Sequence, residues 1–315
     1  MSERTVAVLA VVAAAVLFGT AGTARELGPS GTTPLTLGAT RGALGALTLW
    51  LVVGRAPGRW LAPFRGPIAV GGLGVAVYQP AFFEGVERSG VAVGTIVTIG
   101  SAPFAAGLLD WAVLGRRPSA RWLVATVVTV AGGALLVAAQ SGPDGEIDVI
   151  GLVAAGSAGC GYAVYSTTSK LTIGRGLDPT AALAAPFTLG SSLLVLVALG
   201  GSWSWLAGAG GVALAMYLGV AATGVAYVLY ARGLRTLPSS TAVTLVLAEP
   251  VTASLLAVIV LGEPIPPAGW LGVAIVLVGL GLTGRAAVGP TVDRRRLLDR
   301  RGVVVDPARP GREPT

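Results

Sequence analysis

The sequence of 315 residues has few charged side chains and lacks the residues that most often carry enzymatic chemistry. Charged residues make up 12% of the chain and apolar residues 53%, whereas a soluble domain carries about 25% charged residues. There is no histidine, which excludes a Ser-His pair and a His-ligated metal. The only cysteine, Cys160, excludes an internal disulfide and a cysteine-bound zinc or iron–sulfur site, and its Gly- and Ala-rich surroundings predict a small buried side chain. We therefore expect no cofactor, no metal and no soluble enzyme.

Long apolar runs are what the sequence does contain. A membrane-spanning helix needs about 20 mostly apolar residues. The runs are Thr5–Ala24, Pro34–Val53, Gly66–Phe83, Ser89–Leu109, Trp122–Pro143, Val149–Ser169, Pro179–Ala231, Pro238–Leu261 and Pro264–Gly284. The run Pro179–Ala231 is charge-free for 53 residues and holds a Gly/Trp-rich turn, so it counts as two spans. The sequence predicts an all-α integral membrane protein with ten transmembrane helices.

The positions of the basic residues predict the orientation of these helices. With the N-terminus inside, 19 of the 22 Lys and Arg residues lie on the cytoplasmic side, Arg25 and Arg88 lie outside, and Arg41 lies within a span. Basic loops stay cytoplasmic, so both termini are expected in the cytoplasm of a multi-pass cell-membrane protein. This bias explains the net charge of +7 without a nucleic-acid partner. Residues 286–315 are predicted to form a basic, disordered cytoplasmic tail that can contact anionic lipid.

The two halves of the chain resemble each other. Residues 103–115 read PFAAGLLDWAVLG and residues 250–262 read PVTASLLAVIVLG, with seven of thirteen positions identical. Five helices per half is an odd number, so the second half must enter the membrane in the opposite orientation. Inverted repeats are typical of transporters that bind their substrate between the repeats. We expect one five-helix repeat over 1–143, a second over 144–285, and the tail over 286–315.

The second half also carries a series of motifs. They are Leu229-Tyr230, Thr236-Leu237-Pro238-Ser239-Ser240, Ala248-Glu249-Pro250-Val251 and Leu261-Gly262-Glu263-Pro264, followed by Gly272 and Gly279. On these residues the chain resembles the EamA-like family of the drug/metabolite transporter superfamily, over about residues 5–285. The resemblance implies a central cavity lined by the first four helices of each half, with the fifth helices packed outside it. It also implies efflux of metabolites or drugs. The first half departs from the pattern, with Gly115-Arg116 where members often have Gly-Glu, and Ala102 where the second half has Glu249.

Glu249 is the sharpest candidate for a functional residue. It lies about 11 residues into its span, near the middle of the bilayer, where an ionised carboxylate is costly unless it faces the interior. The neighbouring Pro250 has no N–H and frees the carbonyl of Val246. A locally opened helix with a carboxylate can bind a proton, a cation or a substrate amine. The alternative is a structural acid that is hydrogen-bonded to neighbouring helices.

Arg41 is the second charged candidate within the membrane. Its guanidinium can bind a carboxylate or phosphate of a substrate, pair with Glu249 or Glu84 as a gate, or hold its helix in a structural pair. Glu84 is expected to be a solvated charge at a helix end. Asp110, near the inner end of its span, fits an inner gate and a plain end charge equally well.

Polar and aromatic side chains supply further candidates for a substrate cavity. They are Tyr78 and Gln79 in the third helix, Tyr162 and Tyr165 in the sixth, and Tyr227 and Tyr230 in the eighth. Each tyrosine pair has the i, i+3 spacing that places both rings on one helix face. Such a cavity suits amphipathic organic solutes, and the alternative is ordinary packing.

These features favour a secondary transporter that exports a small organic metabolite or drug by proton coupling or exchange. No Walker motif occurs, so the chain itself does not hydrolyse ATP. A membrane-embedded enzyme would need a nucleophile with a base or a metal cluster, and neither is found. The remaining alternative is a membrane scaffold or sensor subunit, which needs no central charges. The expected partners are a small-molecule substrate and the lipid bilayer, and no signal bears on the oligomeric state.

Overall fold

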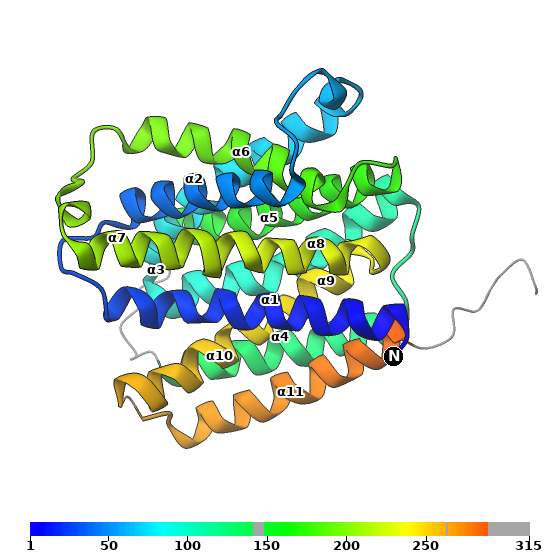
Figure 1. The fold of residues 1–315 in the computed structure, drawn as a ribbon. Coiled ribbons are helices and arrows are strands. Elements are labelled where there is room, and N and C mark those ends of the chain that lie inside the picture. The colour runs from blue at the N-terminus through cyan, green and yellow to red at the C-terminus, as the bar shows by residue number, and fades with distance from the viewer. Residues whose placement is uncertain (141–147, 263, 289–315) are drawn as a thin grey trace, which may run out of the picture.

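The computed structural model describes residues 1–140, 148–262 and 264–288, and this part of the chain is all helical, which confirms the predicted fold class (Figure 1). The longer helices are α1 (Glu3–Glu26), α2 (Pro34–Val53), α3 (Arg65–Leu114), α4 (Ala120–Gln140), α5 (Val149–Gly174), α6 (Pro179–Ala198) and α11 (Pro267–Val288). The shorter ones are η1 (Arg59–Phe64), η2 (Ser204–Ala207), α7 (Ala209–Met216), η3 (Tyr217–Val225), α8 (Ala226–Thr236), α9 (Ser239–Val246), α10 (Ala248–Leu256) and η4 (Ala257–Leu261). Glu263 and most of the predicted tail, residues 289–315, lie outside the described residues.

Ten segments of the described chain are long and apolar enough to cross a membrane, and each overlaps one predicted run. The protein is therefore a multi-pass membrane protein. The eighth span is built from α7, η3 and α8, and the ninth from α9, α10 and η4.

Local sequence explains where several helices begin and end. The side chains of Thr33 and Asp178 accept backbone N–H groups at the starts of α2 and α6, and a proline follows each cap. Proline suits the first helical turn because its missing N–H would have no partner there. Gly54 and Gly115 end α2 and α3 in the left-handed conformation, with φ of +66° at both, which glycine adopts without a steric penalty.

The connection between the third and fourth spans differs from the expected loop. Helical backbone runs from Arg65 to Leu114, yet the chain folds back on itself within it. A Cβ added to Gly94 would lie 2.8 Å from backbone atoms of Gly85 and Val86, although nine residues of straight helix would separate Gly85 from Gly94 by about 13 Å. The third and fourth spans are thus the two arms of one tight hairpin, Arg59–Ser89 and Val93–Leu114.

Glycines allow α3 and α5 to approach until their backbones touch. A Cβ on Gly161 would lie 2.7 Å from the carbonyl oxygen of Gly74, and a Cβ on Gly74 would lie 2.6 Å from that of Gly161. Close contact through small residues drives helix association in lipid, where the hydrophobic effect between helices is absent.

We expect Gly161→Val to destabilise the protein by about 1–3 kcal/mol, because the added side chain meets backbone that cannot move aside. Gly156→Val on the same helix is the matched control, since nothing lies within 4 Å of a Cβ there. Thermal unfolding in detergent measures both variants. Equal losses would mean that the intrinsic helix preference of valine, and not the α3–α5 contact, sets the effect.

The predicted burial of Cys160 is wrong, because its side chain is exposed on α5. The apolar context was not a guide to burial, since a lipid-facing surface is as apolar as the interior of a bundle.

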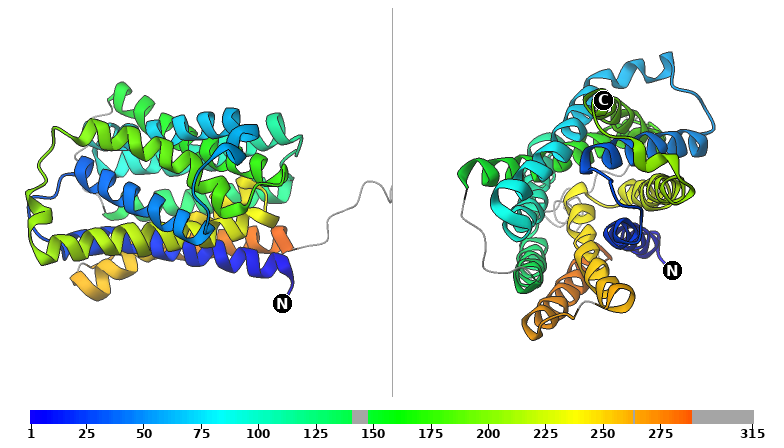
Figure 2. Two further views of the ribbon diagram at one scale, coloured as in Figure 1. Left: turned by 45° about the horizontal axis from the view of Figure 1, so that its top comes forward. Right: turned by 90° about the vertical axis from the view of Figure 1, so that its left-hand side faces the viewer.

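The fifth helix of each half lies at one side of the bundle (Figure 2). α4 and α11 pack against each other along their length, and glycines bring their backbones together. A Cβ on Gly132 would lie 2.6 Å from the backbone nitrogen of Val276, and one on Gly272 would lie 2.6 Å from that of Leu136. The first four helices of each half are thereby left to form the centre.

The N-terminus and the end of α11 lie at the same end of the bundle (Figure 1), hereafter the termini end. A Cβ on Gly284 would lie 3.6 Å from Cγ1 of Val8 in the first turns of α1. Both ends of the membrane domain therefore face the same side of the membrane, as an even number of spans requires.

We expect a reporter fused after Gly284 to be cytoplasmic and one inserted after Pro143 to be external, because 19 of the 22 basic residues then lie inside. Paired alkaline phosphatase and fluorescent-protein fusions measure this. An external C-terminus would reject the orientation.

Candidate functional site

An aromatic cluster fills the centre of the bundle. Its members are Phe18, Tyr78, Tyr162, Tyr165, Phe187, Tyr227 and Tyr230, from α1, α3, α5, α6 and α8. Neighbouring ring centroids lie 4.9 to 6.4 Å apart, and most pairs are tilted or edge-to-face. Such geometries are the favourable ones for aromatic pairs. The structure thus brings all five predicted tyrosines together, with rings from both halves of the chain.

The five tyrosines are not equivalent. Tyr165 and Tyr230 are fully buried, and their hydroxyls bond to the Leu183 carbonyl at 3.3 Å and to Ser166 at 2.8 Å. These two satisfy the packing alternative. Tyr78 and Tyr162 are only half-buried, and their ring centroids lie 5.9 Å apart. They are the two least buried of the five tyrosines.

Arg41 lies on α2 beside this cluster. One turn further along α2, a Cβ on Gly45 would lie 3.4 Å from Cε1 of Phe187 in this cluster. Arg41 forms no ion pair within 4.0 Å in the described part of the chain, and its buried Nε has no hydrogen-bond partner there. The structural-pair alternative requires an ion pair, which Arg41 does not make with the described residues.

Other polar groups line the same face of α2. Gln79 is 6% exposed, and its Oε1 would lie 2.9 Å from a Cβ on Gly38, one turn before Arg41. The hydroxyl of Ser191 faces α2 at Gly42, and the methyl group of Thr223 faces it at Gly45. The hydroxyls of both residues are buried without a hydrogen-bond partner among the described residues. Buried polar atoms are normally paired, so these point to bound water or a solute.

Glu249 lies next to a break in the ninth span. α9 ends at Val246, Leu247 adopts φ −62° and ψ −2°, and α10 begins at Ala248. The missing N–H of Pro250 accounts for the break, because the Val246 carbonyl loses its helical partner. The backbone carbonyl of Glu249 lies against α1, 2.6 Å from a Cβ built on Gly19. The Glu249 side chain is half-buried and forms no hydrogen bond among the described residues.

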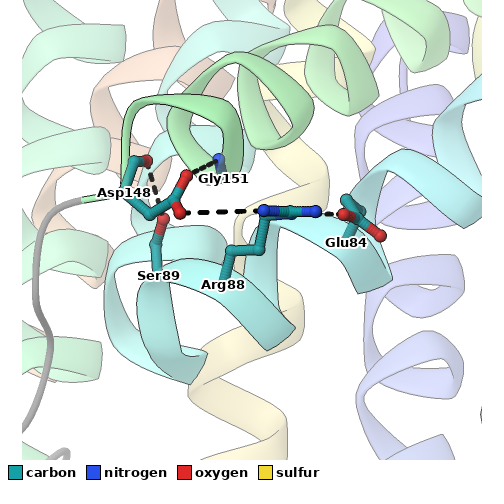
Figure 3. A network of polar contacts seen from close by, with 5 residues as sticks. All are labelled: Glu84, Arg88, Ser89, Asp148 and Gly151. Carbon is teal, nitrogen blue, oxygen red and sulfur yellow. Dashed lines mark hydrogen bonds and ion pairs between the residues drawn. The ribbon is translucent and has the colours of Figure 1, made fainter.

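The opposite end of the bundle holds a separate polar network (Figure 3). Arg88 pairs with Glu84 one turn away and lies 3.8 Å from Asp148. Asp148 in turn caps α5 through the backbone N–H of Gly151 at 2.9 Å, and its carbonyl accepts the Ser89 hydroxyl at 3.2 Å. Glu84 is half-exposed and pairs with Arg88 in this structure, not with Arg41.

Two buried charged side chains bind the turn between α8 and α9, hereafter the elbow, at the termini end. Asp110 of α3 is 1% exposed and accepts hydrogen bonds from the Ser239 hydroxyl and, at 2.9 Å, from the Ser240 backbone N–H. Lys170 of α5 is 6% exposed and donates to the carbonyl of Leu234 at 2.5 Å and that of Arg235 at 3.2 Å. A carboxylate thus meets the N-terminus of α9 and an ammonium meets the C-terminus of α8, as the helix dipoles favour.

The role of Lys170 was missed in the sequence, where it is one of the 19 basic residues counted on the cytoplasmic side. A signal was present, because Lys170 is the only lysine among the 22 basic residues. Asp110 joins α3 to α9 through its hydrogen bonds and is not a plain charge at a helix end.

The arrangement can bind an organic solute at three points. Arg41 offers a cation from the first half, Glu249 offers a carboxylate from the second half, and the half-buried Tyr78 and Tyr162 offer apolar faces with hydroxyls. Within the described ranges no three His, Cys, Asp or Glu residues gather as metal ligands would.

Known proteins share this sequence and fold. The model of the EamA-like transporter family matches residues 5–138 and 149–285. An uncharacterized transporter of Bacillus subtilis (strain 168), YwfM, is 40% identical over 276 residues, which cover 86% of this chain and 91% of that protein. A crystal structure of a protein described no further has the same fold, with a TM-score of 0.74 at 21% identity over 92% of this chain and 98% of the other. The chain therefore belongs to the EamA-like transporter family.

Proposed function

We propose that this membrane transporter is a secondary transporter that exports a small organic metabolite or drug across the cytoplasmic membrane, by proton coupling or by exchange. One observation carries the proposal. A cation on α2 and a carboxylate on α10 each lie within a membrane-spanning segment, and neither forms an ion pair among the described residues. Ionisable side chains inside a membrane are costly when charged, and they typically mark the path of a substrate, ion or proton. The direction of transport rests on the resemblance to the family.

Each charge has a distinct role in the proposal. Arg41 binds an anionic group of the solute through its forked N–H donors. Glu249, beside the open helix turn, takes up a proton or the cationic group of the solute. Tyr78 and Tyr162 turn aside to admit the apolar part of the solute and then stack on it. The two halves then rock about this central site, as inverted repeats do.

Counterflow tests the proposal directly. Purified protein in proteoliposomes is loaded with a mixture of unlabelled metabolites, and accumulation of each labelled solute is followed with and without an imposed pH gradient. We expect at least one amphipathic organic solute to accumulate by exchange. A protein that accumulates none while remaining folded would be the scaffold or sensor subunit of the alternative.

We expect Arg41→Ala to weaken transport of an anionic solute by about 10- to 100-fold in kcat/KM, because one charged hydrogen-bonding partner contributes about 1.5–3 kcal/mol. The kcat/KM for neutral solutes should fall much less. The exposed Arg25→Ala at the far end of α1 is the matched control. If Arg41→Ala reduced transport of anionic and neutral solutes alike, Arg41 would hold α2 in place and would not bind the solute.

A further inference from the structure

A groove of about 500 Å³ opens on the flank of the bundle, away from the central site. It lies where the end of α2 meets η1, the start of α3 and the first half of α6. Its floor is Trp50, whose indole N–H donates to the Thr188 hydroxyl at 2.9 Å. Ile68 and Leu189 form part of its apolar walls. The floor is therefore fixed by a hydrogen bond, and the walls are apolar.

The rim of this groove is basic. Arg59 and Arg65 line it, are exposed, and form no ion pair within 4.0 Å among the described residues. The neighbouring Arg55 stacks on Trp60, with its guanidinium carbon 4.7 Å from the ring centroid. The sequence contains no acidic residue between Glu26 and Glu84. The rim therefore presents two unneutralised guanidinium groups to an anion.

The depth of the groove matches the edge of a bilayer. Ala185 and Leu189 line it six and ten residues after the start of α6, which is about 9–15 Å along the helix. The polar layer on each side of a bilayer is about 5–8 Å thick. The rim then lies at the level of the headgroups, and the lower part lies beside acyl chains. Leu189 in the wall is 40% exposed, and Leu73, 62% exposed and one turn after Ala69 on α3, continues this apolar surface beyond the groove.

We propose that this groove is a binding site for an anionic phospholipid. Arg59 and Arg65 hold the phosphate through paired N–H donors, which suit phosphate oxygens. The acyl chains lie on α3 and α6 over Leu73 and Leu189. A soluble anion would use the rim and leave the apolar walls exposed, whereas a neutral lipid would leave both arginines without a counterion.

Native mass spectrometry of the purified full-length protein tests this site by titration with dioleoylphosphatidylglycerol and dioleoylphosphatidylcholine. The groove variant is Arg59→Gln with Arg65→Gln. The matched control is Arg175→Gln with Arg232→Gln, which removes the same charge from exposed positions at the same end of the bundle. Ala69→Phe narrows the groove from an exposed lining position without changing its charge. Glycerol phosphate serves as the soluble competitor, and circular dichroism confirms that each variant is folded.

We expect phosphatidylglycerol to bind more tightly than phosphatidylcholine. The affinity for phosphatidylglycerol should fall about 25-fold in the groove variant, at about five-fold per arginine. It should change little in the control double variant. Ala69→Phe should also weaken binding, and glycerol phosphate should not displace the lipid. Equal losses in both double variants would assign the preference to the overall field of the basic end and overturn the proposal. The proposal would also be overturned if Ala69→Phe left lipid binding unchanged or if both lipids bound equally. Displacement of the lipid by glycerol phosphate would overturn it as well, because the rim would then be a site for soluble anions.

Discussion

Replacing Asp110 with alanine is expected to lower the stability of the folded protein by about 3–5 kcal/mol, because its buried partners lose a charged acceptor. The side chain is 1% exposed and accepts from the Ser239 hydroxyl and the Ser240 N–H. Alanine leaves that N–H unpaired at the start of α9 and removes a negative charge from a helix N-terminus. Lys170, which holds the other side of the elbow, then remains as a buried cation with no nearby anion. Thermal unfolding in detergent measures the loss.

Asp178→Ala is the matched control for this experiment. Asp178 also caps a helix, accepting from the backbone N–H groups of Thr180 and Ala181 at 2.9 and 3.0 Å, but it is exposed. Water can replace its carboxylate, so we expect a loss of about 1 kcal/mol. If both variants lost the same stability, the burial of Asp110 would contribute nothing beyond an ordinary helix cap.

The sequence predicted the ten spans because apolar length is decided locally. A run of about 20 apolar residues can satisfy its backbone within a membrane only as a helix. The break beside Glu249 was predictable for the same local reason, since Pro250 cannot donate whatever surrounds it. The hairpin within α3 was not, because its two arms approach where Gly94 meets Gly85, a contact that exists only in the folded chain.

The candidate site was predicted in its members but not in their roles. Spacing placed Tyr227 with Tyr230 and Tyr162 with Tyr165, and the structure joins both pairs in one cluster. Which rings are packed and which are half-open depends on contacts between helices that lie far apart in the sequence. The hydrogen bonds of Asp110 and Lys170 to α9 and α8 could not be predicted for the same reason. In the sequence, a charged residue at the end of an apolar run looks the same whether it faces water or caps a distant helix.

Replacing Glu249 with glutamine is expected to abolish the dependence of net transport on a pH gradient while leaving exchange of solute intact. Glutamine is nearly isosteric and retains hydrogen-bonding capacity, but it can neither bind nor release a proton. The Glu249 side chain makes no hydrogen bond among the described residues, and the break at Leu247 is set by Pro250. The variant should therefore fold and insert normally.

Uptake by proteoliposomes with and without an imposed pH gradient measures both activities on one preparation. Glu84→Gln is the matched control, since it also removes one carboxylate from a span but from a half-exposed pair with Arg88, and it should keep the pH response.

The two possible partners of Glu249 give different results. If Glu249 carries the proton, only gradient-driven transport is lost. If it binds the cationic group of the solute, exchange falls as well, most for cationic solutes. An unchanged pH response in Glu249→Gln would return Glu249 to a structural role beside the helix break. Proton coupling would then have to reside in another carboxylate such as Asp110, or transport would proceed by simple exchange.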